Sequence, residues 1–279
     1  MNISKYIELY RKDLILKNYS RNTIENYSSQ VFHFLNKHNS AFTHPEKITE
    51  QVIKDYLLEA KAVNSRKHRI SALKLFYKFT IKQPLKLKNI EYPRSEKKLP
   101  IVLSQNEIQR MFDVCDNLKH KVILGILYSC GLRVGELINL KWSHIDRSRM
   151  VINVVGGKGA KDRQVMLSET ILRLLEKYYY EYRPKEYVLN DQFDLQYSER
   201  SVGQVVKQLA RKAGIKKQVW THLIRHCSFT HMVEQGVDIN LIQRIAGHNS
   251  PKTTAIYTHI SDSIVSKIYS PINSIRVTA

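Results

Sequence analysis

The chain has 279 residues, which is enough for two ordinary domains with a sizeable core. It carries 45 Lys and Arg against 25 Asp and Glu, a formal net charge of +20. This excess favours a polyanionic partner, and nucleic acid is preferred over a membrane because no apolar run approaches a transmembrane length and the N-terminus is not a signal peptide.

The positive charge is spread along the chain. Residues 1–100 hold 20 basic and 9 acidic residues, a net of +11, which leaves 25 and 16, a net of +9, for 101–279. We therefore expect both halves to contact the polyanion, and a disordered basic tail is not the source of the charge.

The first half has the apolar spacing of helices. The pattern predicts four of them: one through Ile7 and Leu16, one capped by Ser20, and two more over 48–58 and 65–81. We expect a helical DNA-binding domain over residues 1–92. A solvated face is the other interpretation of any single lysine there, but the net charge of the whole domain favours a DNA surface.

Residues 93–100 predict a linker. The segment is polar and charged, and it is bracketed by Pro93 and Pro100, which disfavour helix in the residues before them. A second domain is expected over 101–279.

The second half predicts further helices and a small sheet. A capping box at Ser104 precedes a helix, and an apolar helix over 122–130 stops at Gly131. The remaining expected elements are a short helix at 136–140, strands at 150–155 and 164–167, and helices at 169–183, 201–213, 222–235, 238–246 and from Ser250-Pro251 onward. The fold class is therefore mainly α with a small β-sheet.

The three cysteines, Cys115, Cys130 and Cys227, lie far apart and match no metal-ligand spacing. We interpret them as buried small hydrophobic residues in a reducing compartment, the cytoplasm.

Arg133 is the first candidate site residue. It follows Gly131 at the end of the apolar helix, where a guanidinium held by the backbone can make two parallel hydrogen bonds to a phosphate. Glu136, one turn later, is placed to hold that side chain. The alternative is an ordinary Arg–Glu pair on a surface helix.

His222 and Arg225 are three residues apart at the start of a predicted helix, so they flank one point beside a helix N-terminus that attracts anions. Histidine also exchanges protons near neutral pH. A metal site is the alternative, because His222 and His226 have i, i+4 spacing. The zinc-protease pattern requires Glu at the position of Leu223, so no metal is expected.

Lys158, His248 and Tyr257 complete the candidate set. Lys158 lies on a glycine-rich turn and could reach a leaving oxygen, although a solvated turn lysine is the alternative. His248 could donate to a phosphate oxygen or only cap a helix. Tyr257 could attack phosphorus if nearby cations stabilise its phenolate. The turn lacks the spacing of a nucleotide-binding loop, so no cofactor is expected.

The segments GLRVGEL, GGKGAKDR, HLIRH, AGH and IYTH stand in the order found in the tyrosine recombinases (phage-type integrases). The chain resembles the simple Xer-type and integron-type members most closely, and SRNTIENYSSQVFHFL resembles the first helices of their N-terminal domain. The resemblance implies a helical core-binding (SAM-like) domain and an α+β catalytic domain, without the arm-binding domain of larger members. Ile224, Cys227 and Ala246 depart from the usual pattern beside the matching positions.

The resemblance also implies roles. Tyr257 would form a 3′-phosphotyrosyl bond to DNA, Arg133 and Arg225 would clamp the phosphate, and Lys158 would protonate the 5′ oxygen. His222 would accept and donate protons, and His248 would support the phosphate. The implied partner is double-stranded DNA with specific sites, on which four copies assemble through residues 261–275, for integration, excision or dimer resolution. No ATP or metal is implied.

Two other functions fit the same residues. A type IB topoisomerase would relax DNA as a monomer without a specific site. A non-catalytic DNA-binding regulator of the same fold would bind DNA with a steep salt dependence and form no covalent adduct.

Overall fold

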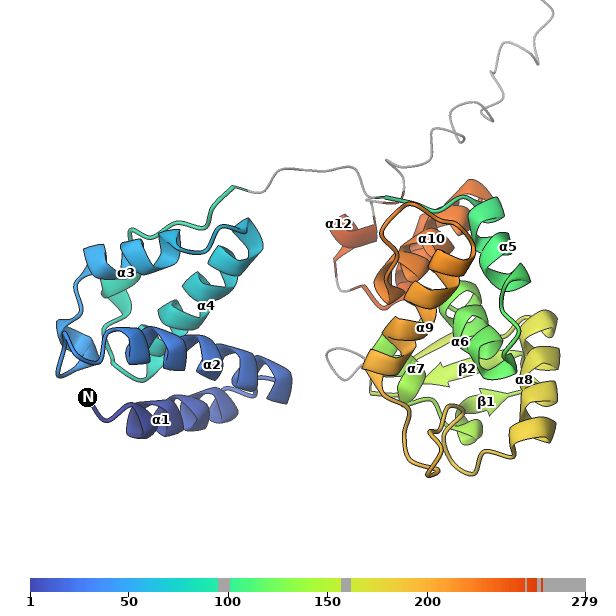
Figure 1. Cartoon of the computed structure of the whole chain (residues 1–279), viewed down its shortest axis with the longest axis horizontal. Coiled ribbons are helices and arrows are strands. Elements are labelled where there is room, and N and C mark those ends of the chain that lie inside the picture. The colour runs from blue at the N-terminus through green and yellow to red at the C-terminus, as the bar shows by residue number, and fades with distance from the viewer. Residues whose placement is uncertain (95–100, 157–161, 249, 255–256, 258–279) are drawn as a thin grey trace, which may run out of the picture. The chain divides into compact units, whose positions relative to one another are not determined.

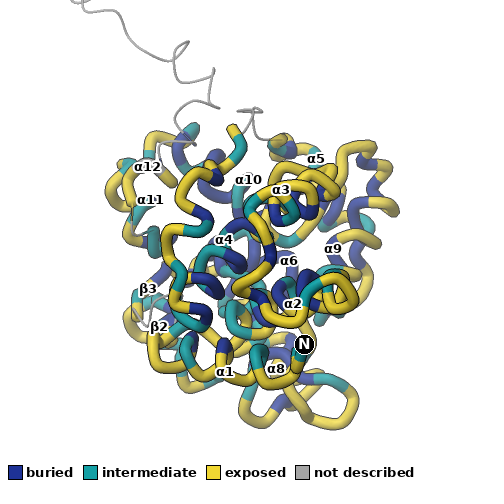
Figure 2. The backbone as a smooth tube through the Cα atoms, turned by 90° about the vertical axis from the view of Figure 1, so that its left-hand side faces the viewer, coloured by how far each residue is buried: buried dark blue, intermediate teal, exposed yellow. Residues whose placement is uncertain are grey.

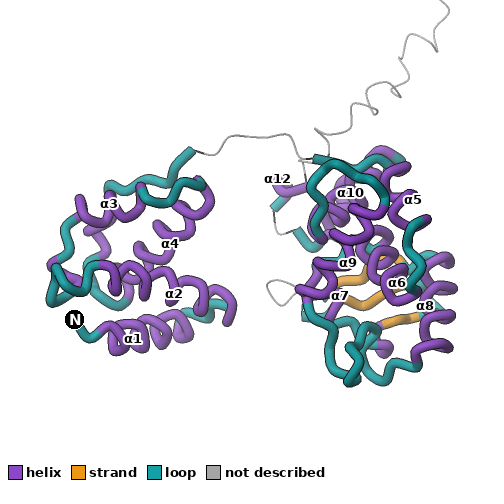
Figure 3. The backbone as a smooth tube through the Cα atoms, in the orientation of Figure 1, coloured by secondary structure: helices purple, strands orange, loops and turns teal. Residues whose placement is uncertain are grey.

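The computed structural model describes residues 1–94, 101–156, 162–248, 250–254 and 257. The chain forms two compact units, Met1–Lys98 and Leu99–Ala279 (Figure 1). Of the expected linker, residues 95–100 lie outside the described part. Both units are mainly helical and the second contains a small sheet (Figure 3), so the predicted fold class is confirmed. No helix in the described part of the chain is long and apolar enough to cross a membrane.

The first unit contains the four predicted helices. These are α1 (Ile3–Leu16), α2 (Arg21–Lys37), α3 (Glu50–Leu58) and α4 (Val63–Phe79), with short 3-10 turns η1 (Pro45–Lys47) and η2 (Pro84–Leu87). The predicted cap is confirmed, because the Ser20 side chain accepts a hydrogen bond from the backbone N–H of Thr23. Helix α2 packs against α1 and α4 around a continuous apolar core.

The second unit surrounds a three-stranded sheet. Its elements are α5 (Gln105–Asp113), α6 (Leu118–Ser129), α7 (Val134–Ile138), η3 (Trp142–His144), β1 (Ile145–Asp146), β2 (Val151–Val154), β3 (Arg163–Met166), α8 (Glu169–Tyr182), α9 (Glu199–Lys212), α10 (Thr221–Glu234), α11 (Ile239–Ala246) and α12 (Pro251–Thr254). The strand order is β1-β2-β3, antiparallel throughout, with Ile152 opposite Val165. Both of these side chains are buried in the core.

Several element boundaries differ from the prediction, and one strand was not predicted. Helix α6 begins at Leu118 rather than at residue 122, because the Asn117 side chain caps it by accepting from the N–H of His120. Helix α7 begins at Val134 rather than at 136, with Arg133 as its N-cap. Strand β1 was not predicted, because a strand of two residues is too short to show an alternating apolar pattern.

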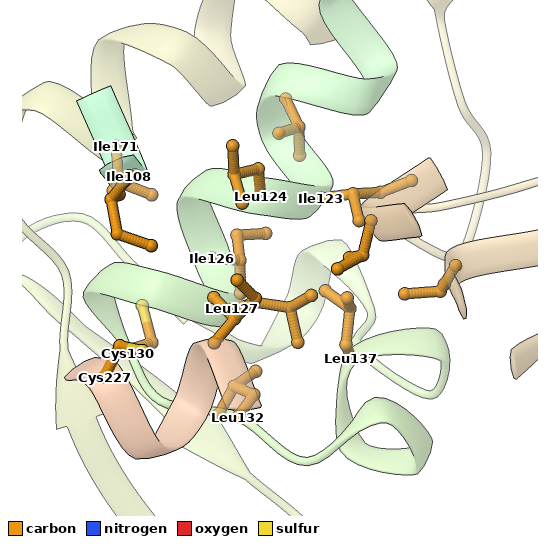
Figure 4. Packing of buried hydrophobic residues seen from close by; sticks show 14 of the residues in the cluster. Ile108, Ile123, Leu124, Ile126, Leu127, Cys130, Leu132, Leu137, Ile171 and Cys227 are labelled. Carbon is orange, nitrogen blue, oxygen red and sulfur yellow. The ribbon is translucent and has the colours of Figure 1, made fainter. Parts of the chain in front are cut away.

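Helix α6 is the centre of the second unit's core. It contacts α8 and α10, and Leu118 and the six consecutive residues 122–127 along it are buried. Leu132 and Leu137, on either side of Arg133, belong to the same apolar cluster as α6 (Figure 4). Most of α10 is buried as well (Figure 2). The segment that carries Arg133 is therefore anchored on both sides. The three cysteines are buried and free, as predicted.

Gly131 ends α6 in a conformation that side chains rarely adopt. Its φ is +59°, and an added Cβ would lie 2.6 Å from Phe229 Cζ on α10. Gly131 is thus required twice, for the left-handed turn and for the close approach of α10. Gly214 has a similar φ of +66°, but nothing lies within 4 Å of its missing Cβ.

We predict that Gly131→Ala destabilises the second unit much more than Gly214→Ala. The left-handed backbone costs about 1 kcal/mol in both variants. The clash with Phe229 adds about 1–3 kcal/mol in Gly131→Ala alone, as overpacking does in other cores. Urea unfolding of both variants measures the difference, and equal losses would show that Phe229 moves aside freely.

Candidate active site

Arg225 is the most buried member of the predicted site. It projects from the second turn of α10 and is 0% exposed. Its guanidinium donates to the carbonyl oxygens of Gly131 and of Ala246, the latter at 2.6 Å, and lies 4.8 Å from the centre of the Phe229 ring. Its Nε is buried and has no hydrogen-bond partner among the residues that the structure describes. Burial, and then the charge of Arg133, lower the Arg225 pKa to about 10.

The environment of Arg225 is that of an anion site. A buried cation costs free energy unless an opposite charge compensates it. Within the described residues its hydrogen bonds go to backbone carbonyls and to a histidine, and none goes to a carboxylate. An incoming phosphate would supply the missing negative charge.

Arg133 meets Arg225 at the end of α11. Its Nη2 donates to the carbonyls of Ala246 (3.1 Å) and Gly247 (3.2 Å), so both arginines share the oxygen of Ala246. Its Nη1 donates to Glu136 at 2.7 Å, which confirms the predicted role of that glutamate. The Arg133 side chain is 25% exposed, so it connects the buried cluster with solvent.

Arg163, which the sequence analysis did not select, fixes Glu136 from the other side. Its Nη1 and Nη2 donate to the two carboxylate oxygens at 2.8 and 2.7 Å, and its Nε donates to the carbonyl of Ile245 at 2.6 Å. Burial would raise the pKa of Glu136, but the hydrogen bonds from Arg163 and Arg133 outweigh it and lower the pKa to about 2. Arg163 is 27 residues from Glu136 in sequence, so their contact could not be predicted from local spacing. Its position just after the glycine-rich turn was the one sequence feature that could have marked it as a site residue.

Helix α11 ends at Ala246 because Gly247 adopts a left-handed conformation with φ +60°. Arg133, Arg163 and Arg225 meet at this helix end. The last carbonyls of a helix lack helical donors and carry partial negative charge. Here guanidiniums supply those donors, to the carbonyls of Ile245, Ala246 and Gly247. One carboxylate, Glu136, lies in hydrogen-bond contact with this arginine cluster, which leaves an excess of positive charge.

His248 follows Gly247 directly, as predicted. Its Nε2 lies 3.4 Å from an Arg225 nitrogen that can only donate, so Nε2 accepts and the ring proton is on Nδ1. That proton points to Thr254 Oγ1 at 3.0 Å. Burial, then Arg225 and Arg133, lower the His248 pKa to about 4. The ring is therefore neutral near pH 7 and stacks on Tyr257 at 6.2 Å between centroids.

Tyr257 lies inside the same cluster and is 1% exposed. Its ring contacts Phe229 and His248, and its Oη lies 3.0 Å from Nδ1 of His226. Burial raises the Tyr257 pKa to about 12, while Arg225 and then Arg133 act in the opposite direction. The phenol is thus protonated at neutral pH, with its oxygen already beside cations.

The two histidines of α10 lie at different depths. His222 is exposed at the start of the helix, and its ring lies 4.4 Å from that of His226, one turn further in. The protein around its ring still removes part of the hydration of a charged imidazole, and this desolvation, then the charges of Arg225 and Arg133, lower the His222 pKa. His226 was weighed above only as a metal ligand. In the described part of the chain no three His, Cys, Asp or Glu residues gather at metal-binding distance.

The structure thus brings together Arg133, Arg225, His248 and Tyr257, with His222 one helical turn away. It adds Glu136, Arg163 and His226 to them. Lys158 lies outside the described residues. The strands β2 and β3 on either side of its turn are described, and Arg163 ties the start of β3 to the site.

Comparison with known proteins gives consistent matches. The profile of the phage integrase family matches residues 102–263, and that of the phage integrase N-terminal SAM-like domain matches residues 7–84. The tyrosine recombinase XerA of Pyrococcus horikoshii is 33% identical over 268 residues, covering 92% of this chain and 90% of the relative.

Two solved structures share the fold. A XerH site-specific recombinase bound to palindromic difH substrate, a post-cleavage complex, has a TM-score of 0.75 at 22% identity and covers 90% of this chain and 80% of that chain. A lambda integrase tetramer bound to a Holliday junction has a TM-score of 0.74 at 17% identity, with coverages of 91% and 76%.

We predict that Glu136 makes the second unit sensitive to acid. Its pKa is lowered on folding from 4.5 to about 2, so its stabilising effect is complete above pH 4.5 and is lost as the pH falls toward 2. The shift corresponds to about 3 kcal/mol of unfolding free energy. Unfolding of the wild type and of Glu136→Gln, measured from pH 7 to pH 3, should give curves that converge in acid. Parallel curves would contradict the prediction.

Proposed function

The chain belongs to the phage integrase family and is a tyrosine recombinase, and we propose that Tyr257 is its nucleophile. The observation that supports this is the burial of one phenol within a cluster of arginines in which Glu136 is the one carboxylate among the described residues. Oη of Tyr257 attacks the scissile phosphorus, a 3′-phosphotyrosyl bond forms, and the bond from phosphorus to the 5′ oxygen breaks. A 5′-hydroxyl strand then reverses the step on a new partner.

Arg133 and Arg225 bind the non-bridging oxygens of that phosphate. Both are already oriented by backbone carbonyls, so little side-chain freedom is lost when the phosphate arrives. Phosphate binding stabilises Arg225 most, because the charge of Arg225 is buried and its Nε has no partner among the described residues. In the transition state, where negative charge on the phosphate oxygens increases, this fixed positive charge stabilises the reacting group.

His222, His248 and Lys158 complete the proposed chemistry. His222 is exposed at the N-terminal end of α10, where the helix dipole favours an anion, and exchanges protons at the phosphate. His248 buttresses Arg225 and the ring of Tyr257. We assign to Lys158 the protonation of the 5′ oxygen. One phosphodiester replaces another of similar energy, so the exchange itself requires no ATP.

The proposed partner is double-stranded DNA with specific recognition sites, acted on in the cytoplasm. Both halves of the chain are basic, with net charges of +11 and +9. We further propose that four copies assemble on two sites through residues 261–275. The similar fold of a lambda integrase tetramer on a Holliday junction supports this assembly.

We predict that purified wild-type protein forms a covalent adduct with DNA and that Tyr257→Phe forms none. The measurement uses sheared DNA of the host: adducts that survive detergent are isolated and their DNA is sequenced, which also reveals the target. The matched control is Tyr178→Phe. Tyr178 is 0% exposed in the same unit and its hydroxyl has no partner in the described part of the chain, so losing that hydroxyl should leave stability and adduct formation intact.

The outcomes separate the competing functions. An adduct formed by Tyr257→Phe would mean that another residue is the nucleophile. DNA binding with a steep salt dependence but without any adduct would indicate a regulator. Adducts without a shared sequence, together with relaxation of supercoiled plasmid by a monomer, would indicate a topoisomerase.

A further inference from the structure

The two histidines of α10 differ in their access to the nucleophile. His226 Nδ1 lies 3.0 Å from Oη of Tyr257, with ring centroids 5.6 Å apart. His222 is on the exposed first turn, and no hydrogen bond between His222 and Tyr257 exists in the described structure. A group that takes a proton must lie within hydrogen-bond reach of it. His226 meets this condition before any DNA is bound.

In the empty site the proton stays on the phenol and the imidazole is neutral, so the transfer waits for a change in the charge around His226. Burial, then His222 and Arg225, lower the pKa of His226 to about 4, so the ring is neutral and has a free lone pair. The pKa of Tyr257 is raised to about 12, so its proton is still present. In the tautomer with the ring proton on Nε2, the phenol donates to Nδ1 of His226.

We propose that His226, rather than His222, accepts the phenolic proton of Tyr257 as the phosphotyrosyl bond forms. The inference rests on the proposed function of Tyr257. The bond from Oη to phosphorus forms while the O–H bond breaks, and the proton passes to Nδ1 of His226, which becomes an imidazolium. The bond from phosphorus to the 5′ oxygen breaks, and that oxygen receives a proton from a separate acid. In the rejoining step the imidazolium returns the proton to the departing phenolate.

Bound DNA would make this transfer easier. The groups that face His226 are His222 and Arg225 on its own helix and Tyr257 from the segment after α12. Arg225 disfavours a second positive charge in the empty site. A phosphate bound to Arg225 adds a negative charge there and stabilises the imidazolium. The proton therefore moves only when substrate is in place, which leaves His222 available for the phosphate oxygens.

The test uses full-length protein and a nicked duplex of the sequence recovered by the covalent mapping, under single-turnover conditions. The variants are His226→Ala and His226→Asn. Asparagine can keep a hydrogen-bonding atom near the position of Nδ1 but cannot take up a proton. The matched control is His231→Asn, because His231 lies on the same helix and makes an equivalent bond, Nδ1 to the Tyr128 hydroxyl at 2.8 Å, outside the site.

We expect both His226 variants to form the adduct about 100-fold more slowly or worse, the usual range for loss of a general base. Their DNA affinity and thermal unfolding should match those of His231→Asn, which cleaves at the wild-type rate. A duplex with sulfur in place of the 5′-bridging oxygen should not restore the cleavage rate of the His226 variants. A thiolate leaves without being protonated, so the sulfur removes the need for the general acid but not for the base that accepts the phenolic proton. The same duplex should restore Lys158→Ala.

Three results would overturn the inference. The first is a wild-type rate for His226→Asn, which would reduce His226 to a positioning residue. The second is rescue of the His226 variants by the bridging sulfur. The third applies if the His226 variants do not fold, in which case ¹⁵N spectra of the histidine rings are recorded for the wild type and for Tyr257→Phe. We expect the wild type to show an unprotonated Nδ1 on His226 whose signal shifts in Tyr257→Phe. An unchanged signal would refute the contact between the two side chains. Failure of the wild type to form any adduct would instead refute the proposed function.

Discussion

The end of α11 is the interaction on which the rest of the site depends. Its carbonyls would be unsatisfied after the left-handed turn at Gly247, and guanidiniums from the N-cap of α7, from β3 and from α10 satisfy them. Arg133 and Arg225 are 92 residues apart in sequence, yet both donate to the oxygen of Ala246. The same contacts that complete a helix terminus therefore hold two cations at one point, before any anion arrives.

Glu136 sets how much of that charge remains. It accepts from the Arg133 backbone and side chain and from both terminal nitrogens of Arg163, so its carboxylate is fully occupied. It neutralises one charge of the cluster and orients Arg133, while Arg225 keeps a buried charge without a carboxylate partner. Such an arrangement stores unfavourable electrostatic energy in the empty site, and a bound phosphate relieves it. The same arginine contacts thus both fix the side chains of the site and favour the binding of an anion.

Much of the fold could be predicted from local patterns. The caps at Ser20 and Ser104, the stop at Gly131 and the turn at Gly247 are local chemistry, and each was confirmed. The predicted boundaries were wrong where the sequence pattern was short or polar. Helix α6 begins a turn earlier than predicted because Asn117 caps it, and β1, with two residues, was missed. Apolar spacing also predicted the four helices of the first unit, because apolar residues at helical spacing lie on one face and are buried together. Leu16, which is 83% exposed, is an exception.

The sequence by itself determined the basic charge of both halves, the helical class and the order of Arg133, His222, Arg225, His248 and Tyr257, because these depend on residue type and spacing along the chain. Only the tertiary structure decided that Arg163 holds Glu136 and that His226, not His222, touches Tyr257. The physical reason is that helical spacing specifies which side chains share a face, whereas the neighbour that meets the face depends on the packing of distant segments. His226 and Tyr257 are 31 residues apart, and packing of the Tyr257 side chain against α10 brings them together.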